Sequence, residues 1–449
     1  MTAPLHRIGA AGLLVLAYAA MCLAIWWRQR RRRAAAASAA AVLACDGAPS
    51  TVLVVFATQT GQAEAIAWQT GRALHAQGTP VRVLSLNDLD VTTLRAAQRA
   101  LFVVSTYGEG DAPDGASLFT ERCMGTVEAL PALRYALLAL GDRQYAHFCG
   151  FGRALDAWLQ STGAVPVAPR IEVDNGDPVA LADWHAQWGG GASETDDDFA
   201  PWRLVTRELL NPGSEGGPVY HLGFQAPHGA APDWQSGDLV QVALTSDPSR
   251  PRDYSVASIP SDGELQLLVR QERHPDGTLG AASGLLTSTL ALGDTVAMRL
   301  RPHPNFRLGD NAERPLILIG NGTGLAGLRG HLRARAAAGQ HENWLVFGER
   351  RATHDALCRG ELDAWQASGV LRRLDMAFSR DQAESVYVQH RLLQAADEVQ
   401  AWLARGAAVY VCGSLQGMAG GVDAALRQIA GERQMRELIG SGRYRRDVY

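Results

Sequence analysis

The sequence of 449 residues contains no lysine, so all 42 of its basic residues are arginines, set against 46 acidic residues. A Walker phosphate loop needs a lysine after its glycines, and a pyridoxal phosphate enzyme needs one for its Schiff base. The absence of lysine therefore excludes both kinds of site. The formal charge of −4 also argues against a nucleic-acid-binding protein, because such proteins usually carry a clustered basic excess.

Cysteine is scarce as well. The six cysteines include no C-x-x-C pair, so the sequence predicts neither a zinc site nor an iron–sulfur cluster, and a reducing compartment fits best. The length allows about three domains of roughly 150 residues each.

Charge is absent from residues 8–27, and at about 1.5 Å per residue a helix of this length crosses a hydrocarbon core of roughly 30 Å. Arginines at 28 and 30–33 follow at once, so the positive-inside rule places the rest of the chain in the cytoplasm. We therefore expect a single-pass membrane anchor with its tether over residues 1–50. The alternatives are a soluble or cleaved segment, including a weak lipoprotein cleavage box at 43–45.

Residues 51–190 alternate between short apolar runs and helical patterns. This alternation predicts an α/β domain in which a parallel sheet carries helices on both faces. Ligands of such sheets bind beyond the carboxyl ends of the strands. The predicted strands are 52–57, 81–86, 100–105, 135–140 and 165–167.

Three loops that follow these strands contain unusual residues. Residues 58–64 supply hydroxyls and a glycine at the start of a helix, which suits a phosphate held by backbone N–H groups. Residues 105–111 and 141–149 each offer a predicted exposed aromatic, Tyr107 and Tyr145, among glycines. Any one loop could be a helix cap or a solvent turn, but together they predict a site for a flat ring with a phosphate.

After a flexible linker at 191–200, residues 201–310 form short alternating segments with Gly and Pro turns, which predict an antiparallel β-barrel. Within it, Arg-Asp-Tyr-Ser at 252–255 and Gly-Ala-Ala-Ser at 280–283 suit a diphosphate and a ring. The alternative for these short strings is an edge strand with a surface ion pair and a capping turn.

Residues 311–449 return to an α/β pattern typical of a nucleotide-binding domain. A strand at 315–319 runs into Gly-Asn-Gly-Thr-Gly at 320–324 and then a helix, the arrangement in which a dinucleotide pyrophosphate meets a helix N-terminus. Ser379 and Arg380 follow a predicted strand at 370–377, and an arginine beside a hydroxyl suits a ribose 2'-phosphate. A solvated surface arginine is the alternative.

These motifs, in this order, resemble those of the diflavin reductases, in which a flavodoxin-like FMN domain precedes a ferredoxin-NADP reductase module. The flavoprotein subunit of sulfite reductase and the NADPH-haemoprotein reductases are the nearest likeness. The resemblance implies that FMN contacts Thr58, Gln59, Thr60, Gln62, Ala63, Thr106, Tyr107, Gly108, Gly110, Gly141, Tyr145, Phe148, Cys149 and Asp174.

For the reductase module, the resemblance implies an FAD-binding barrel and an NADPH-binding domain. The hydride-transfer set would be Ser255, Cys412 and Asp447, with Tyr449 stacked on the FAD ring. FAD would be held by Arg252, Tyr254, Ser255, Gly280 and Ser283, and NADPH by Gly322, Thr323, Ser379, Arg380, Tyr387 and Gln389.

The chain departs from the family pattern at three places. Only 13 residues separate Asp238 from Arg252, where full-length relatives insert a helical connecting domain of over a hundred residues. Asn321 stands where the family usually has proline, and Ser385 where many relatives have a lysine for the 2'-phosphate. The docking of the two flavin domains is therefore expected to depend on the linker and on direct contacts.

The implied activity carries electrons from NADPH through FAD and FMN to a one-electron acceptor such as a haemoprotein. The alternatives are a ferric chelate or another membrane-associated metal acceptor, and a non-catalytic flavin-binding scaffold. Residues 51–198 hold nine arginines and eighteen acidic residues, whereas residues 199–449 are balanced. The predicted FMN domain is therefore acidic and would steer a basic partner protein.

Overall fold

The computed structural model describes residues 51–125, 129–143, 145–189, 199–227, 232–245 and 247–449. The membrane anchor and tether predicted over residues 1–50 lie outside this part of the chain. Among the described helices, none combines the length and the apolar character that a bilayer crossing requires.

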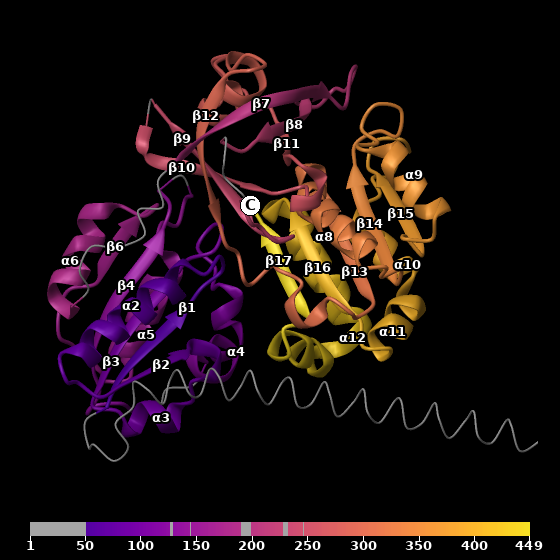
Figure 1. Ribbon diagram of the computed structural model, residues 1–449. Helices are drawn as coiled ribbons and strands as arrows, with labels where there is room; N and C mark the ends of the chain where they lie inside the picture. Colours follow the sequence, from indigo (N-terminus) through magenta and orange to yellow (C-terminus); the bar gives the residue numbers. More distant parts are fainter. Residues whose placement is uncertain (1–50, 126–128, 144, 190–198, 228–231, 246) are drawn as a thin grey trace, which may run out of the picture.

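The described chain forms three blocks, which Figure 1 shows in indigo to magenta, in pink and in orange to yellow. The first block is a parallel sheet in which the central strand contributes side chains to a separate core on each face. One core packs against the helices α2 and α6, and the other against α5. Its main elements are β1 (Val52–Ala57), α2 (Gln62–Ala76), β2 (Val81–Ser85), β3 (Arg99–Ser105), β4 (Arg134–Gly141), α5 (Gly150–Ser161) and α6 (Pro178–Trp188).

The fifth strand of this sheet differs from the prediction. Over the predicted run 165–167, the structure has only β5 (Val165–Pro166), whose two residues are both exposed. A further strand, β6 (Ile171–Asp174), pairs with β4 and places Asp174 opposite Gly141. The apolar run was misleading because its side chains face solvent, while β6 buries only Val173 and carries a weaker pattern.

The second block is an antiparallel sheet of six strands in the order β10-β9-β12-β7-β8-β11. The edge strands β10 and β11 approach each other without a ladder between them among the described residues. The antiparallel sheet is thus confirmed, while its closure into a barrel stays a prediction. The strands are β7 (Ala200–Leu209), β8 (Val219–Gln225), β9 (Leu239–Leu244), β10 (Asp247–Ser255), β11 (Leu265–Arg270) and β12 (Thr295–Arg301).

The third block is a parallel sheet in the order β15-β14-β13-β16-β17. Its last strand, β17, was not predicted, because the segment is polar and rich in arginine; it lies at the sheet edge that faces the first block in Figure 1. The elements are β13 (Leu316–Asn321), α8 (Leu325–Ala337), β14 (Asn343–Glu349), α9 (Arg359–Ala367), β15 (Arg373–Phe378), α10 (Val388–Gln394), α11 (Ala396–Ala404), β16 (Ala408–Gly413), α12 (Gly420–Gly440) and β17 (Tyr444–Val448).

Candidate functional site

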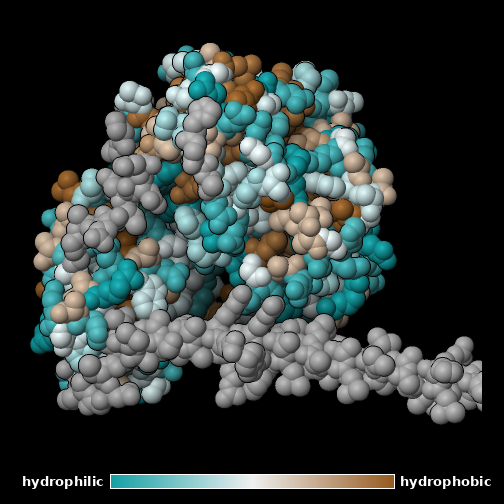
Figure 2. Space-filling model, in the orientation of Figure 1, coloured by the Kyte–Doolittle hydropathy of each residue, from teal (hydrophilic) through white to brown (hydrophobic). Residues whose placement is uncertain are grey.

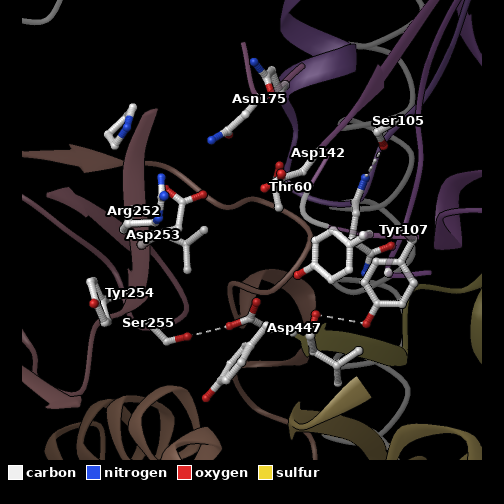
Figure 3. Close-up of a pocket in the computed structure, with 18 of the residues that line it drawn as sticks. Thr60, Ser105, Tyr107, Asp142, Asn175, Arg252, Asp253, Tyr254, Ser255 and Asp447 are labelled. Atoms are coloured by element: carbon white, nitrogen blue, oxygen red, sulfur yellow. Dashed lines mark hydrogen bonds between the residues drawn. The ribbon is translucent and has the colours of Figure 1, made fainter. Parts of the chain in front are cut away.

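A cavity of about 480 Å³ lies where the three blocks meet, and all three contribute to its lining. Figure 3 shows side chains of the first block facing those of β10, with Asp447 of β17 between them. The lining includes these predicted site residues: Gln59, Thr60, Gln62, Thr106, Tyr107, Gly108, Gly141, Tyr145, Phe148, Cys149, Arg252, Tyr254, Ser255, Ser283, Thr323, Asp447 and Tyr449.

The remaining predicted residues fall into two groups. One group adjoins lining residues in sequence or by hydrogen bonds and consists of Thr58, Ala63, Gly110, Asp174, Gly280, Gly322 and Cys412. The other group lies outside the cavity, at the end of β15 and the start of α10, and consists of Ser379, Arg380, Tyr387 and Gln389. The structure therefore assembles the predicted flavin residues around one cavity and keeps these four predicted NADPH residues apart from it.

The predicted phosphate loop ends β1 and begins α2. The Gly61 N–H donates to Thr58 Oγ1 at 2.8 Å, and Gly61 itself adopts φ 93°, a conformation that favours glycine. The N-cap residue of α2 is Gly61, which has no side chain to cap the first turn, so the backbone N–H groups and the positive end of the helix dipole suit an anion.

Gln59 connects this loop to the third block. Its side-chain amide donates to Asp114 Oδ2 at 3.2 Å and to the Arg446 carbonyl at 3.1 Å, and it accepts from the Asp114 N–H at 2.9 Å. The polar atoms of this side chain therefore already hold the loop against β17.

Tyr107 is not the exposed aromatic that the sequence predicted. Only 6% of it is exposed; its hydroxyl donates to the Val448 carbonyl at 3.2 Å, and the Arg446 guanidinium lies 5.5 Å from its ring centroid. This burial raises the pKa of the phenol above its usual value. Tyr145, in the neighbouring loop, is half-buried and lines the cavity. The prediction failed for Tyr107 because β17, which covers it, was not predicted.

The loop after β4 folds tightly against the sheet. A Cβ on Gly141 would lie 2.8 Å from the Cys149 nitrogen, so only glycine fits there. The Cys149 thiol donates to the Ala139 carbonyl at 3.3 Å, and burial raises its pKa to about 12. Asp174 Oδ1 accepts from the Arg143 N–H at 3.0 Å, so this carboxylate orders the loop from outside the cavity.

The predicted hydride-transfer residues come together from three strands. Ser255 at the end of β10 donates its hydroxyl hydrogen to Asp447 Oδ2 on β17 at 2.8 Å, and the Cys412 thiol of β16 lies 3.7 Å from the same oxygen. Cys412 is fully buried, and burial together with the Asp447 carboxylate raises its pKa well above the usual value. The thiol therefore stays protonated, and the cluster offers a hydroxyl, a thiol and a carboxylate at one end of the cavity.

Tyr449 completes this end of the cavity. Its phenol oxygen lies 3.1 Å from Thr323 Oγ1, and its backbone N–H donates to the Gly413 carbonyl at 3.0 Å. The residue is 51% exposed, and its stacking on the FAD ring stays a prediction.

The glycine-to-serine turn of the second block is confirmed as a close-packed turn. Ser283 Oγ accepts from the Glu272 N–H at 3.1 Å, and a Cβ on Gly280 would lie 2.9 Å from that oxygen. Gly280 is therefore required by packing, and Ser283 lines the cavity from the start of the short helix α7 (Ala281–Gly284).

The glycine-rich loop of the third block connects β13 to α8 through a short turn, Gly322–Gly324. A Cβ on Gly324 would lie 2.1 Å from the Cys412 carbonyl oxygen, so the turn crosses β16 at a distance that only glycine permits. Asn321 Oδ1 accepts from the Ser414 N–H at 2.9 Å. This hydrogen bond holds the loop after β16 in place. The proline usual in the family has no side-chain acceptor and could not form it.

The predicted 2'-phosphate residues lie at the carboxyl end of β15. The Ser379 N–H donates to the Glu349 carbonyl at 2.9 Å, and Arg380 lies 3.5 Å from the Glu215 carboxylate. Arg351, which was not predicted, lies 3.6 Å from the same carboxylate and donates to the Arg380 carbonyl at 3.0 Å. The Glu-Arg-Arg run that ends β14 was the sequence signal for this second arginine.

Arg270 of β11 was also missed. It pairs with the buried Glu349 at 3.0 Å and lines the cavity, and a Cβ on Gly322 would lie 3.4 Å from its Nη2. Burial raises the pKa of the Glu349 carboxyl, and the neighbouring Arg270 guanidinium offsets part of this rise. A cation therefore lies beside the glycine-rich loop, where a diphosphate would pass.

Two buried polar atoms fit the ligands that the motifs imply. Among the described residues, Thr106 Oγ1 beside the cavity and Gln389 Oε1 at the start of α10 have no hydrogen-bond partner. Such atoms are costly unless a ligand or water satisfies them. Together with the open N-terminus of α2 and the glycine turns, they show that the residues present fit two flavins and a pyridine nucleotide.

Comparison with known proteins agrees with this geometry. Residues 54–188 match the Flavodoxin family model, and residues 318–424 match the Oxidoreductase NAD-binding domain model. The sulfite reductase [NADPH] flavoprotein alpha-component of Bacillus subtilis (strain 168) is 27% identical over 89% of each chain. The protein of that name from Shewanella sp. (strain MR-7) is 29% identical over 90% of each chain, and that from Photobacterium profundum is 26% identical over 91% of this chain and 90% of its own.

The alignment with the Bacillus protein spans 539 positions, although it uses 89% of a chain of 449 residues, so more than a hundred of its positions face no residue of this chain. These unmatched positions agree with the absence from this chain of the connecting domain that full-length relatives contain. The two family models, the relatives that match nearly the whole length and the assembled cavity lead to one conclusion. The chain resembles the diflavin reductases along nearly its whole length, and its relatives are flavoprotein components of NADPH-dependent sulfite reductases.

Proposed function

We propose that this protein is a membrane-anchored, cytoplasm-facing diflavin reductase that reduces a haemoprotein of the sulfite reductase kind. When bound, NADPH, FAD and FMN supply the redox chemistry, in which electrons pass from the nicotinamide through both flavins to a one-electron acceptor. The observation that carries the proposal is that Ser255 and Asp447, with Cys412 bonded to the same carboxylate, share one cavity with residues of the FMN-type phosphate loop.

The residues of this cluster have a positioning role and do not themselves react. The Asp447 carboxylate accepts hydrogen bonds from Ser255 and Cys412, so its orientation is fixed by strands β10 and β16. The thiol keeps its proton because burial raises its pKa. A fixed carboxylate beside a neutral thiol and a hydroxyl can hold the nicotinamide close to a flavin ring in the geometry that transfer requires.

Direct contacts replace the missing connecting domain. Arg446 of β17 forms an ion pair with Asp114 of the first block, with Nε 2.9 Å from Oδ1, and Arg436 of α12 pairs with Glu121 at 2.7 Å. Together with the bond from Tyr107 to Val448, these contacts bring the FMN-type loops to the edge of the reductase module. Flavin-to-flavin transfer then needs no further domain.

A basic haemoprotein is the acceptor that the charge favours. Residues 51–190 hold fourteen acidic residues against nine arginines, and two of the acidic residues, Asp114 and Glu121, pair with arginines of the third block. On the described part of the face shown in Figure 2, apolar residues form small separate groups among polar ones. Docking on this face would therefore depend on charge more than on apolar contact. The relatives carry the name of a sulfite reductase component, which is why we propose that class of partner.

A ferric chelate is the second candidate acceptor. The apolar run at residues 8–27 and the short connection between Asp238 and Arg252 favour it, because they set this chain apart from the full-length pattern. A non-catalytic flavin-binding scaffold is the remote alternative, and the intact hydrogen bonds from Ser255 and Cys412 to Asp447 argue against it.

The experiment that tests the proposal uses the full chain purified from membranes. It should carry about one FMN and one FAD per chain, and its NADPH oxidation should be faster with the sulfite reductase haem subunit than with ferric citrate. Flavin contents far below two per chain would refute the diflavin assignment, and faster turnover with ferric citrate would favour the second candidate. Deletion of residues 1–50 should move the protein from the membrane fraction to the supernatant; if the intact chain is already in the supernatant, the anchor is refuted.

A further inference from the structure

The phosphate loop of the first block is in contact with the second block. Arg301, the last residue of β12, donates from Nη2 to Thr60 Oγ1 at 2.8 Å. Two residues farther along, His303 Nε2 lies 3.2 Å from the Gln59 carbonyl oxygen, to which Asn305 Nδ2 also donates at 2.9 Å. The segment from Arg301 to Asn305 therefore runs along the loop that the family uses for the FMN phosphate.

The first block supplies hydroxyls and backbone N–H groups to this loop, whereas the second block supplies positive charge. In the described part of the chain, the arginines that line the cavity are Arg252, Arg270 and Arg301, and they come from β10, β11 and β12. The sequence has no lysine that could supply this positive charge instead. An arginine is therefore the permanently charged group that can contact a phosphate at Thr60, and the Arg301 guanidinium already lies within hydrogen-bond distance of the Thr60 hydroxyl.

Asp253 orients the Arg301 side chain. Arg301 Nη1 donates to Asp253 Oδ2 at 2.5 Å, and Asp253 belongs to the Arg252–Ser255 motif on the neighbouring edge of the cavity. A guanidinium has five N–H donors, so bonds to Asp253 and Thr60 leave donors for a third partner. A partner with several oxygens, such as a phosphate, matches this planar fork. Figure 3 shows Thr60 and Asp253 facing each other across the cavity, the gap that Arg301 bridges.

We propose that Arg301 completes the FMN phosphate site from the second block, so that the 5'-phosphate of FMN is held by two blocks at once. The inference depends on the proposed function in that FMN is taken as the ligand of the first block. It adds a binding residue that lies outside the flavodoxin-like block. It also makes the phosphate part of the contact between blocks, in a chain that lacks a connecting domain to hold them.

The test compares FMN with riboflavin, which has the same ring and no phosphate. The full chain is freed of FMN, and each flavin is titrated while its fluorescence is followed. Arg301→Ala should weaken FMN binding at least tenfold and change riboflavin binding by less than twofold. Arg301→Lys keeps the charge but loses the fork, so it should fall between wild type and Arg301→Ala.

Arg299 provides a matched control on the same strand. Its guanidinium donates to Gln241 Oε1 at 2.7 Å and lies 4.6 Å from the Phe199 ring centroid, and it does not line the cavity. Arg299→Ala removes the same charge from β12 and should leave both affinities unchanged. Bound FAD, measured in every variant, reports whether the second block remains folded.

The outcomes separate this inference from the proposed function. If wild type binds FMN and Arg301→Ala binds it equally well, the Arg301 inference is wrong and the proposed function stands. If Arg301→Ala weakens FMN and riboflavin by the same factor, the arginine acts on the fold of the loop, and the inference is likewise wrong. If wild type binds neither flavin, the assignment of FMN to the first block fails, and the inference fails with it.

Discussion

Ser255 donates its hydroxyl hydrogen to Asp447 at 2.8 Å, although 192 positions of the sequence separate the two residues. Ser255 ends β10 in the second block, and Asp447 lies on β17, the strand added to the edge of the third. Cys412 lies 3.7 Å from the same carboxylate oxygen. Neither block forms this cluster by itself. The cluster therefore depends on the docking of the second and third blocks.

The first prediction concerns Asp447. Asp447→Asn keeps the shape of the side chain but removes its charge and one acceptor oxygen, so positioning of the nicotinamide should suffer. We expect flavin reduction by NADPH, followed by stopped-flow absorbance, to slow at least about tenfold, or about 1.4 kcal/mol of activation free energy. Flavin content should not change. Asp363→Asn, on the exposed face of α9, is the control, and an unchanged rate in Asp447→Asn would remove this carboxylate from the mechanism.

The second prediction concerns the ion pair between Asp114 and Arg446. Asp114→Asn weakens a partly buried ion pair between the first and third blocks, so onward transfer between the flavins should slow several-fold. The initial reduction of FAD by NADPH should keep its rate. Glu121→Gln alters the exposed pair with Arg436 and should have a smaller effect, because exposed pairs contribute about 0–1 kcal/mol.

Stopped-flow traces at two wavelengths separate these two phases. A variant in which both phases slow equally would indicate damage to the reductase module instead of weaker docking. A variant in which neither phase changes would show that the pair between Asp114 and Arg446 does not hold the blocks together.

Loop motifs at strand ends were predictable because backbone rules fix where they must lie. Parallel strands bring their carboxyl ends to one edge of a sheet, so the loops after β1, β3 and β4 had to meet. The helix predicted to follow the glycine run at 320–324 is confirmed as α8, which begins at Leu325. Glycine spacing carried this information directly, since a side chain on Gly324 would collide with the Cys412 carbonyl.

Contacts between blocks were not predictable in the same way. β17 consists of Tyr, Arg, Arg, Asp and Val, and nothing in this alternation reveals that it adds to β16 and covers Tyr107. Likewise, in the sequence Arg301 is one more charged residue near the end of a strand. Only the three-dimensional structure shows that its side chain contacts Thr60. Local patterns determine elements, whereas the partner of a side chain in another block depends on docking that no local pattern records.

The third prediction concerns the nucleotide preference. Arg380 and Arg351 lie 3.5 and 3.6 Å from the same Glu215 carboxylate, so the two guanidinium groups are neighbours at the end of β15. Each exposed arginine can contribute to a 2'-phosphate, and Arg380→Ala should raise the KM for NADPH several-fold while leaving that for NADH unchanged. Arg351→Ala should have a similar, smaller effect, and the double variant should lose most of the preference.

Steady-state kinetics with both nucleotides check this prediction. Arg359→Ala removes an arginine that pairs with Asp363 on α9 and serves as the control for charge alone. Equal losses with NADPH and NADH would mean that these arginines support the fold of the loop and do not read the 2'-phosphate.

The fourth prediction concerns acid stability and His331. This fully buried imidazole lies 5.0 Å from the Phe306 ring and 4.8 Å from the Tyr410 ring, with Nδ1 3.1 Å from Ser236 Oγ. Burial lowers its pKa to about 3, whereas an unfolded histidine titrates near 6.5. Between these values the unfolded chain binds a proton that the folded chain does not, so the free energy of unfolding must fall as the pH drops below about 6.5.

His331→Leu removes this proton uptake. Its absolute stability will differ from wild type through packing, so the quantity to compare is the change of the urea midpoint between pH 7 and pH 5, followed by tryptophan fluorescence. The midpoint should fall less in His331→Leu than in wild type, and His341→Leu, at an exposed position, should behave as wild type. His303, whose pKa burial also lowers, is present in all three proteins, so part of the fall in midpoint remains in His331→Leu. Parallel pH profiles in wild type and His331→Leu would mean that the folded chain accepts a proton at His331 and that this site is more open to water than its packing indicates.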